Sequence, residues 1–286
     1  MIRSAVTISL VPEARSGPFV FHGDLAAGCA AARAQGFDAV EIFPGHADEL
    51  DGYQLRELLR QHGLSLAAIG TGAGWVRHQH RLTDPDPHRR MAARDFAAAI
   101  IDFAGGFGAP AIIGSLQGRW GEGSTREQAL GWLRQELDQL APRAHALGVP
   151  LLFEPLNRYE SNLFNTVAEG LSFLDSLQTR NVALLCDLFH ENIEEADVAA
   201  ALQLAGKRLG HVHFADSNRR AMGFGHLDVA PIAAALRSMG YQGYISAECL
   251  PFPNSEAAAV QTIRSFQQFF PRTVTAEASI APGAGA

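Results

Sequence analysis

Short apolar runs alternate with amphipathic segments along almost the whole chain. Each run is four to six residues long, which suits a strand that is buried on both faces. The eight runs lie at residues 5–10, 39–43, 64–69, 111–114, 149–154, 182–187, 209–214 and 243–248. The segments between them have helical spacing, for example at Leu130, Leu133, Leu137 and Leu140. The pattern therefore predicts strands and helices in strict alternation.

This alternation predicts one closed barrel. Strands that alternate with helices form a parallel sheet, and eight such units over roughly 270 residues match the usual size of a (β/α)8 TIM barrel. Glycines stand where several of the expected helices must end: Gly36, Gly63, Gly108, Gly148 and Gly240. We therefore predict a single α/β barrel domain over residues 1–270. A doubly wound open sheet is the alternative, but no GxGxxG follows the first run.

The last segment of the chain, residues 271–286, breaks the pattern. Its sequence PRTVTAEASIAPGAGA is rich in small residues and has no helical or strand period. Such a segment cannot bury enough apolar surface to offset the cost of ordering it. We expect a disordered tail there.

Composition and charge exclude several classes of protein and partner. The chain has 286 residues, 47% of them hydrophobic, and a formal net charge of −7, so it is expected to be globular and not to bind nucleic acid. The three cysteines, Cys29, Cys186 and Cys249, are far apart and indicate a reducing compartment. No signal-peptide pattern and no long uncharged apolar stretch is present. We therefore expect a cytoplasmic protein that does not bind membranes.

Lysine chemistry depends on one residue. Lys207 is the single lysine of the chain, and Schiff-base aldolases, pyridoxal-phosphate enzymes and P-loop proteins all need a lysine amine. Lys207 precedes the seventh expected strand, which places it at the amino-terminal face of the barrel, away from the usual position of barrel active sites. We expect it to be dispensable.

Four polar residues stand at the ends of four consecutive expected strands. Glu154, Asp187, His213 and Glu248 are separated by intervals of one strand–helix unit each. The carboxyl ends of barrel strands meet at one mouth, where active sites are found. Each residue alone would fit a helix cap or an ion pair equally well. Together they predict a metal site, because charges packed at one mouth repel each other unless a cation neutralises them.

The donor set favours a hard or borderline divalent ion. Three carboxylates and one imidazole, without a thiolate, suit Mn²⁺, Mg²⁺ or Co²⁺ better than Zn²⁺. His211 shares a face with His213 and is expected one layer deeper, as a supporting or core group rather than a ligand. The pair His78 and His80 is a second, less favoured metal motif, because it falls in an expected loop.

A family resemblance is carried by longer motifs. The stretches FEPLNRYE, CDLFHENIEE, HVHFADSNRRAMGFGHLD and SAECLP resemble the xylose-isomerase-like sugar isomerase/epimerase family. Within it they are similar to the ketose 3-epimerases, and most similar to the 5-keto-L-gluconate epimerases. The resemblance covers nearly the whole chain before residue 271. One departure is Ala221-Met222, where a small residue followed by proline is expected in these relatives, and it leaves the exact substrate open.

The resemblance implies roles for individual residues. The family's four metal ligands fall on Glu154, Asp187, His213 and Glu248, and its acid/base pair falls on Glu154 and Glu248. Its substrate-binding positions fall on Glu160, His190 and Arg219. The list of implied ligands is the same as the one indicated by the strand ends.

The activity implied is epimerisation of a keto-sugar or keto-sugar acid at C3. A proton next to the carbonyl is removed through an enediolate that a divalent ion, Mn²⁺ first among the candidates, stabilises. A homo-oligomer, dimer or tetramer, is also implied. Alternatives are an aldose/ketose isomerase such as hydroxypyruvate isomerase, and an inosose dehydratase or isomerase.

An alternative of another class is a DNA-repair endonuclease that binds several zinc ions. It needs further ligands on the second to fourth expected strands, which end in Phe43, Ile69-Gly70 and Gly114-Ser115. The acidic net charge also opposes it.

Overall fold

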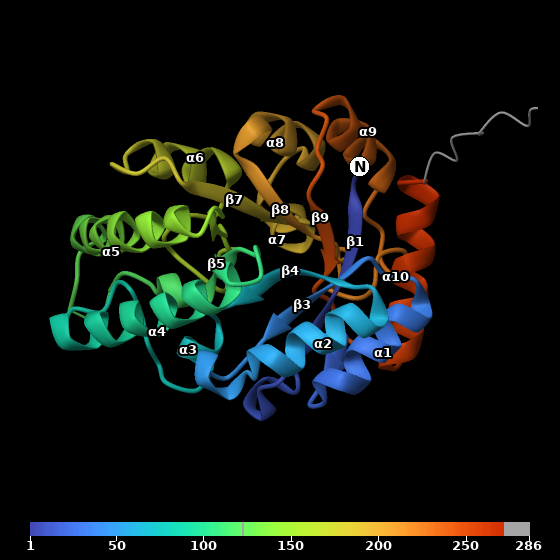
Figure 1. Ribbon diagram of the computed structural model, residues 1–286. Helices are drawn as coiled ribbons and strands as arrows, with labels where there is room; N and C mark the ends of the chain where they lie inside the picture. Colours follow the sequence, from blue (N-terminus) through green and yellow to red (C-terminus); the bar gives the residue numbers. More distant parts are fainter. Residues whose placement is uncertain (122, 272–286) are drawn as a thin grey trace, which may run out of the picture.

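The strands of the computed structural model, which describes residues 1–121 and 123–271, form a closed parallel barrel. Neighbouring strands follow one another in chain order, and pairing of the first strand with the last closes the ring (Figure 1). The barrel strands are β1 (Arg3–Ser9), β3 (Ala39–Phe43), β4 (Ser65–Gly70), β5 (Ala111–Ile113), β6 (Leu151–Phe153), β7 (Val182–Asp187), β8 (Leu209–His213) and β9 (Tyr244–Ala247). The predicted (β/α)8 TIM barrel is confirmed, and each strand lies on one of the eight apolar runs.

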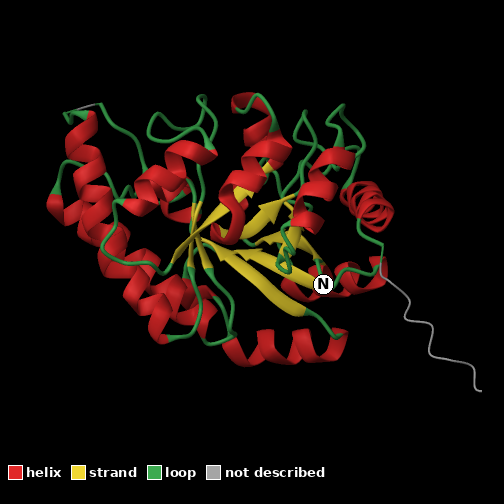
Figure 2. Ribbon diagram, turned by 90° about the horizontal axis from the view of Figure 1, so that it is seen from above, coloured by secondary structure: helices red, strands yellow, loops and turns green. Residues whose placement is uncertain are grey.

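Helices surround the strands on the outside (Figure 2). The outer helices are α1 (Leu25–Gln35), α2 (Gly52–His62), α4 (Pro87–Gly105), α5 (Arg126–Ala146), α6 (Val167–Asp175), α8 (Val198–Ala205), α9 (Val229–Ser238) and α10 (Ser255–Phe269). Short helices lie in the connections: α3 (Ala73–Val76), α7 (Leu188–Glu194), η1 (Pro12–Ala14), η2 (Ala47–Glu49), η3 (Ser115–Gln117) and η4 (Gly206–Arg208). All of these short helices except η4, which directly precedes β8, follow a strand and so lie at the mouth of the barrel.

One strand among the described residues was not expected from the sequence, and neither were the short helices in the connections, such as α7, which contains His190. The two-residue strand β2 (Phe21–His22) pairs in parallel with the end of β1. It is too short to produce an apolar run, so periodicity gives no signal for it. The segment expected to be a disordered tail, 271–286, lies outside the described residues except for Pro271.

Glycine ends the first two outer helices as predicted. Gly36 and Gly63 cap α1 and α2 with φ angles of 89° and 59°, a backbone conformation that costs other residues free energy. On α5, the leucines with helical spacing face the core, since Leu133, Leu137 and Leu140 are buried. The amphipathic pattern thus identified both the helices and their inward faces.

The interior of the barrel changes from apolar to polar along the strands. Ala68, Ile112, Leu152 and Leu185 form a small apolar cluster separate from the main core, which lies between strands and helices. Beyond this cluster, polar side chains such as His213 project inward near the carboxyl ends. The apolar layer closes the barrel beneath the polar layer, so reactive groups are accessible only from the mouth.

The cysteines are buried, and the lysine lies at the opposite end of the barrel from the polar layer. All three cysteines are buried free thiols. Lys207 lies exposed in η4, directly before β8, at the amino-terminal end of the barrel. None of the helices within residues 1–121 and 123–271 is both long enough and apolar enough to cross a bilayer.

Candidate metal centre and active site

The four residues at the strand ends converge on one point. Glu154 follows β6, Asp187 ends β7, His213 ends β8 and Glu248 follows β9. One ligand atom from each lies within 4.8 Å of the others. The sequence separated these residues by whole strand–helix units, and barrel closure brings them together.

The donor atoms at this point lack partners. Glu154 Oε1, Asp187 Oδ2 and His213 Nδ1 are buried and have no hydrogen-bond partner in the described part of the chain. His213 Nδ1 lies 3.6 Å from Glu154 Oε1, 3.7 Å from Asp187 Oδ2 and 3.5 Å from Glu248 Oε2. Buried charged groups without partners are costly. The donor set therefore fits a divalent ion that binds all four.

Local structure fixes the direction of two of the carboxylates. Asp187 Oδ1 caps α7 by accepting a hydrogen bond of 2.8 Å from the Phe189 N–H, which leaves Oδ2 for the site. Gly114 directly follows β5, and a Cβ there would collide with the Glu154 carboxylate. The helix cap thus orients the Asp187 carboxylate, and the absence of a side chain at Gly114 leaves room for the Glu154 carboxylate.

The carboxylates differ in their affinity for protons. Burial raises the pKa of Glu248 to about 8, with the Glu154 carboxylate adding to the shift and His213 opposing it. Burial also acts to raise the pKa of Asp187, but His190 and His213 outweigh it and lower that pKa to about 2. Without a cation, Glu248 is therefore the carboxyl group that retains a proton near neutral pH.

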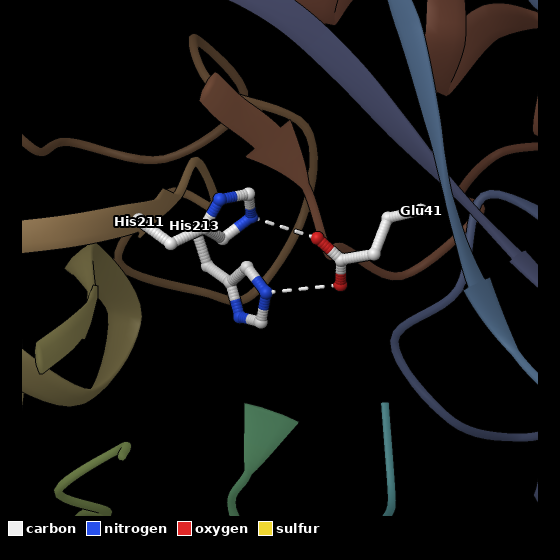
Figure 3. A group of neighbouring side chains, drawn as sticks. All are labelled: Glu41, His211 and His213. Carbon is white, nitrogen blue, oxygen red and sulfur yellow. Dashed lines mark hydrogen bonds and ion pairs between the residues drawn. The ribbon is translucent and has the colours of Figure 1, made fainter. Parts of the chain in front are cut away.

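Glu41 on β3 supports the site and had no role in the sequence-based prediction. His211 and His213 project from β8 toward the two oxygens of its carboxylate (Figure 3). His211 Nε2 lies 2.8 Å from Oε2, and His213 Nε2 lies 3.1 Å from Oε1. Between β8 and β3 lie β9 and β1, so these bonds cross the barrel interior. Only one signal in the sequence pointed to Glu41, a lone carboxylate in the buried run AVEIF.

The hydrogen bonds to Glu41 determine which nitrogen of each histidine ring carries hydrogen. Nearby His213 and His211 outweigh the effect of burial and hold the pKa of Glu41 well below its usual range, so its carboxylate only accepts. Both Nε2 atoms therefore carry hydrogen, which leaves His213 Nδ1 as the ring nitrogen that can bind a cation. Although burial opposes it, the Glu248 and Glu41 carboxylates raise the pKa of His213, so without a cation Nδ1 holds a proton that a metal ion would displace. The expectation that His211 is a supporting group agrees with this arrangement.

The three residues expected to bind substrate lie together at one side of the site. Arg219 Nη1 donates to Glu160 Oε1 at 2.6 Å, and Nη2 donates to Glu248 Oε2 at 3.4 Å. His190 Nε2 lies 3.8 Å from Glu154 Oε1 and 3.7 Å from Asp187 Oδ2. All three residues line a cavity of about 490 Å³ that also reaches Glu154, His213 and Glu248. This volume is within the range of small-molecule sites.

The loop after β8 holds Arg219 in place. Arg219 has a φ of 58°, which is unusual for a residue other than glycine. Its N–H donates to the carbonyl of the buried residue Asp216, whose carboxylate accepts from the N–H groups of Ser217, Gly223 and Leu227. Asp216 was not identified from the sequence, because nothing in the pattern showed that the loop folds around it.

The less favoured candidates lie elsewhere. The rings of His78 and His80 stack on each other at 5.3 Å and neither residue lines the cavity. Ala221 and Met222, the position of the departure from the family motif, are both buried. The donor set at the mouth is thus built from the strand ends and not from these motifs.

Relatives of known activity cover most of the chain. An L-ribulose 3-epimerase of Mesorhizobium japonicum is 34% identical over 76% of this chain and 72% of its own length. A D-psicose 3-epimerase of Ruminiclostridium cellulolyticum is 32% identical over 74% of each chain. Among solved structures, that of an L-ribulose 3-epimerase superimposes with a TM-score of 0.77 at 26% identity, covering 94% of each chain.

The family follows from a match over the barrel itself. The sequence profile described as xylose isomerase-like TIM barrel matches residues 29–269, which include all four residues of the metal centre. This match and the relatives agree with the resemblance carried by the sequence motifs. The chain therefore belongs to the xylose isomerase-like TIM barrel family, among whose curated members its relatives include ketose 3-epimerases and a 3-dehydro-D-guloside 4-epimerase of Escherichia coli.

Proposed function

We propose that this protein is a divalent-metal-dependent epimerase of a keto-sugar or keto-sugar acid, acting at C3. The observation that carries the proposal is the convergence of two glutamates, from barrel strands that are not neighbours, on one point. Glu154 and Glu248 come from strands separated by β7 and β8, yet both carboxylates lie within 4 Å of His213 Nδ1. The names of the relatives, L-ribulose and D-psicose 3-epimerase, support the same reaction.

The metal ligands in this proposal are Glu154, Asp187, His213 and Glu248. A bound divalent ion supplies a Lewis acid that stabilises negative charge on a substrate oxygen. We propose Mn²⁺ first, with Mg²⁺ or Co²⁺ as alternatives, because the donors are three carboxylates and one imidazole.

The two glutamates divide the proton transfers between the faces of the substrate. One carboxylate takes the C3 proton, and the electron pair of the broken C–H bond forms the enediolate. The other glutamate, as the carboxylic acid, delivers a proton to C3 from the opposite face, which inverts the configuration. The roles are exchanged in the reverse direction. Each carboxylate has two oxygens, so one can bind the ion while the other exchanges a proton.

Glu160, His190 and Arg219 position the substrate in this proposal. The Arg219–Glu160 ion pair offers both donors and acceptors at the cavity wall, as sugar hydroxyls require. Although burial opposes it, the surrounding carboxylates of Glu248, Asp187 and Glu160 raise the pKa of Arg219, so its charge is permanent. A polyhydroxylated ligand therefore meets, in Arg219, a hydrogen-bond donor whose charge does not change.

The position of solvent exchange tests the reaction. The protein is incubated with Mn²⁺ in D₂O and, in turn, with D-fructose, D-tagatose, L-ribulose and 5-keto-L-gluconate. After removal of the metal by a chelator, NMR locates the deuterium. We expect deuterium at the hydroxyl-bearing chain carbon next to the ketone, which is C3 in the three ketoses and C4 in 5-keto-L-gluconate, together with the inverted product for at least one substrate. Deuterium confined to other carbons would instead support the aldose/ketose isomerase or inosose alternatives.

Removing the carboxylate of Glu41 should weaken metal binding. In Glu41→Gln the side chain keeps one acceptor oxygen for two ring N–H groups, so the orientation of His213 is no longer fixed. We expect the affinity for Mn²⁺ to fall about 10- to 100-fold, as measured by titration calorimetry.

The matched control for this variant is Glu136→Gln. Glu136 is a buried glutamate on α5 that pairs with Arg94, outside the cavity, and its variant should bind Mn²⁺ normally. Unchanged affinity in Glu41→Gln would contradict the supporting role. Two ions per wild-type chain, with one lost in this variant, would show that Glu41, His211 and His213 form a second metal site.

A further inference from the structure

A buried ring nitrogen of His190 faces the site without a partner. The side chain of His190 is 2% exposed, and within the described residues its Nε2 makes no hydrogen bond. Nε2 lies too far from Glu154 Oε1 and Asp187 Oδ2 to bond them, at 3.8 and 3.7 Å. His190 lines the cavity, so this atom is placed to meet a ligand.

The other ring nitrogen of His190 is occupied by Asn157. The Asn157 Nδ2 atom lies 2.6 Å from His190 Nδ1, and Asn157 is 1% exposed. The orientation of the amide follows from its other contacts: Oδ1 accepts from the Tyr159 N–H at 3.0 Å, and Nδ2 donates to Glu160 Oε1 at 3.2 Å. The opposite orientation would place a donor against the Tyr159 N–H and an acceptor against the carboxylate.

The state of His190 follows from this orientation. An amide nitrogen only donates hydrogen bonds, so His190 Nδ1 must accept and cannot carry hydrogen. The hydrogen of the neutral imidazole is then on Nε2, the atom that faces the cavity.

We propose that Asn157 is a positioning residue that keeps His190 in the Nε2–H form, so that this N–H donates a hydrogen bond to an oxygen of the substrate. The identity of that oxygen rests on the proposed function: it is the oxygen that gains negative charge when the C3 proton leaves. A donor already directed at developing charge lowers the barrier to its formation. His190 transfers no proton in this role.

The contrast with His213 explains why two neighbouring imidazole rings have different roles in the site. An acceptor, the Glu41 carboxylate, holds the N–H at Nε2 of His213 and leaves Nδ1 as the nitrogen that can bind a cation. A donor, the Asn157 amide, holds Nδ1 of His190 and leaves N–H on Nε2. A nitrogen that carries hydrogen cannot bind a metal ion, so His190 stays free for the substrate although it lies beside two of the proposed ligands.

The hydrogen position is tested by NMR on the protein loaded with Mg²⁺, which is diamagnetic. The protein is labelled with ¹⁵N-histidine, and the His190 signals are assigned by their loss in His190→Gln. We expect the long-range ¹H–¹⁵N pattern of the neutral Nε2–H form at pH 7.5. The Nδ1–H form, or a doubly protonated ring, would overturn the proposal, and this result needs no variant of Asn157 and no active substrate.

The variant Asn157→Asp reverses the polarity of the partner. A carboxylate only accepts, so His190 should now carry hydrogen on Nδ1, and the same spectrum should report the change. If the proposed function holds, kcat at saturating substrate should fall about 100-fold, as for the loss of one directed donor, with Mg²⁺ content unchanged. An Nε2–H spectrum in this variant, or a changed spectrum with unchanged kcat, would contradict the proposal.

Asn162→Asp is the matched control. Asn162 lies in the same loop, bonds to the backbone of Trp120 and does not line the cavity. The substitution Asn162→Asp introduces the same charge as Asn157→Asp but does not contact His190. Both the NMR spectrum and kcat should therefore remain those of the wild type. If no sugar in the panel reacts but the spectra behave as expected, the proposed function fails and the assignment of His190 stands.

Discussion

Glutamine at either Glu154 or Glu248 should abolish net epimerisation, with kcat falling by at least about 10³-fold. Each glutamate serves one face of the substrate in the proposed reaction, and glutamine neither removes nor returns a proton there. The more informative result is partial activity. A variant that keeps one carboxylate should still exchange the C3 proton of one epimer with D₂O without inverting it, which NMR detects.

Glutamine also removes a negative charge from the metal centre. Metal content must therefore be measured on the same samples, so that the loss of a base is distinguished from the loss of the ion. Glu136→Gln again provides the matched change at a buried glutamate outside the cavity and should retain full activity. Normal inversion by either site variant at full metal occupancy would exclude the two-face mechanism.

Asp187→Asn should remove most of the bound metal and with it more than 99% of the activity. This variant tests metal binding more specifically than alanine would, because asparagine keeps an oxygen that can cap α7 by accepting from the Phe189 N–H. What it loses is the ionised oxygen directed at Glu154 and His213, and hard divalent ions bind neutral amides more weakly than carboxylates. Metal content after gel filtration and turnover at low added Mn²⁺ provide the measurement.

The helix-cap effect has its own control. Asp197 caps α8 through a 3.0 Å hydrogen bond from the Ala200 N–H, and Asp197→Asn makes the same chemical change at a residue that does not line the cavity. It should leave metal content and turnover unchanged. A fully loaded and active Asp187→Asn protein would remove Asp187 from the proposed ligands.

The fold was predictable because its signals are local. Each barrel strand is a short apolar run, and each outer helix shows its inward face in the spacing of its apolar residues. Barrel closure also made the convergence of Glu154, Asp187, His213 and Glu248 predictable, because strand ends meet wherever eight parallel strands close. Among the described strands, only β2 was not predicted, because two residues are too few to form a hydrophobic pattern.

The groups that support the site were not predictable in the same way. Glu41 acts across the barrel from His213, and its role depends on which interior layer each residue reaches. Asn157 acts through the orientation of its amide, which its neighbours Tyr159 and Glu160 determine only in the folded chain. Such roles depend on hydrogen bonds between residues that are brought together by folding. Residue type and spacing in the sequence do not predict these hydrogen bonds. The cytoplasmic location, the homo-oligomer and the disordered tail remain predictions.

The single lysine lies on the face opposite the mouth, so a chemical group coupled to it is attached at a known side of the molecule. Reagents that couple to amines reach one exposed lysine side chain, Lys207 in η4 before the amino end of β8, and the α-amine of Met1, which precedes β1 at the same end of the barrel. A support or label joined there would leave the cavity at the carboxyl ends of the strands facing solution. Lysine-directed immobilisation should therefore attach the protein in one orientation with substrate access preserved.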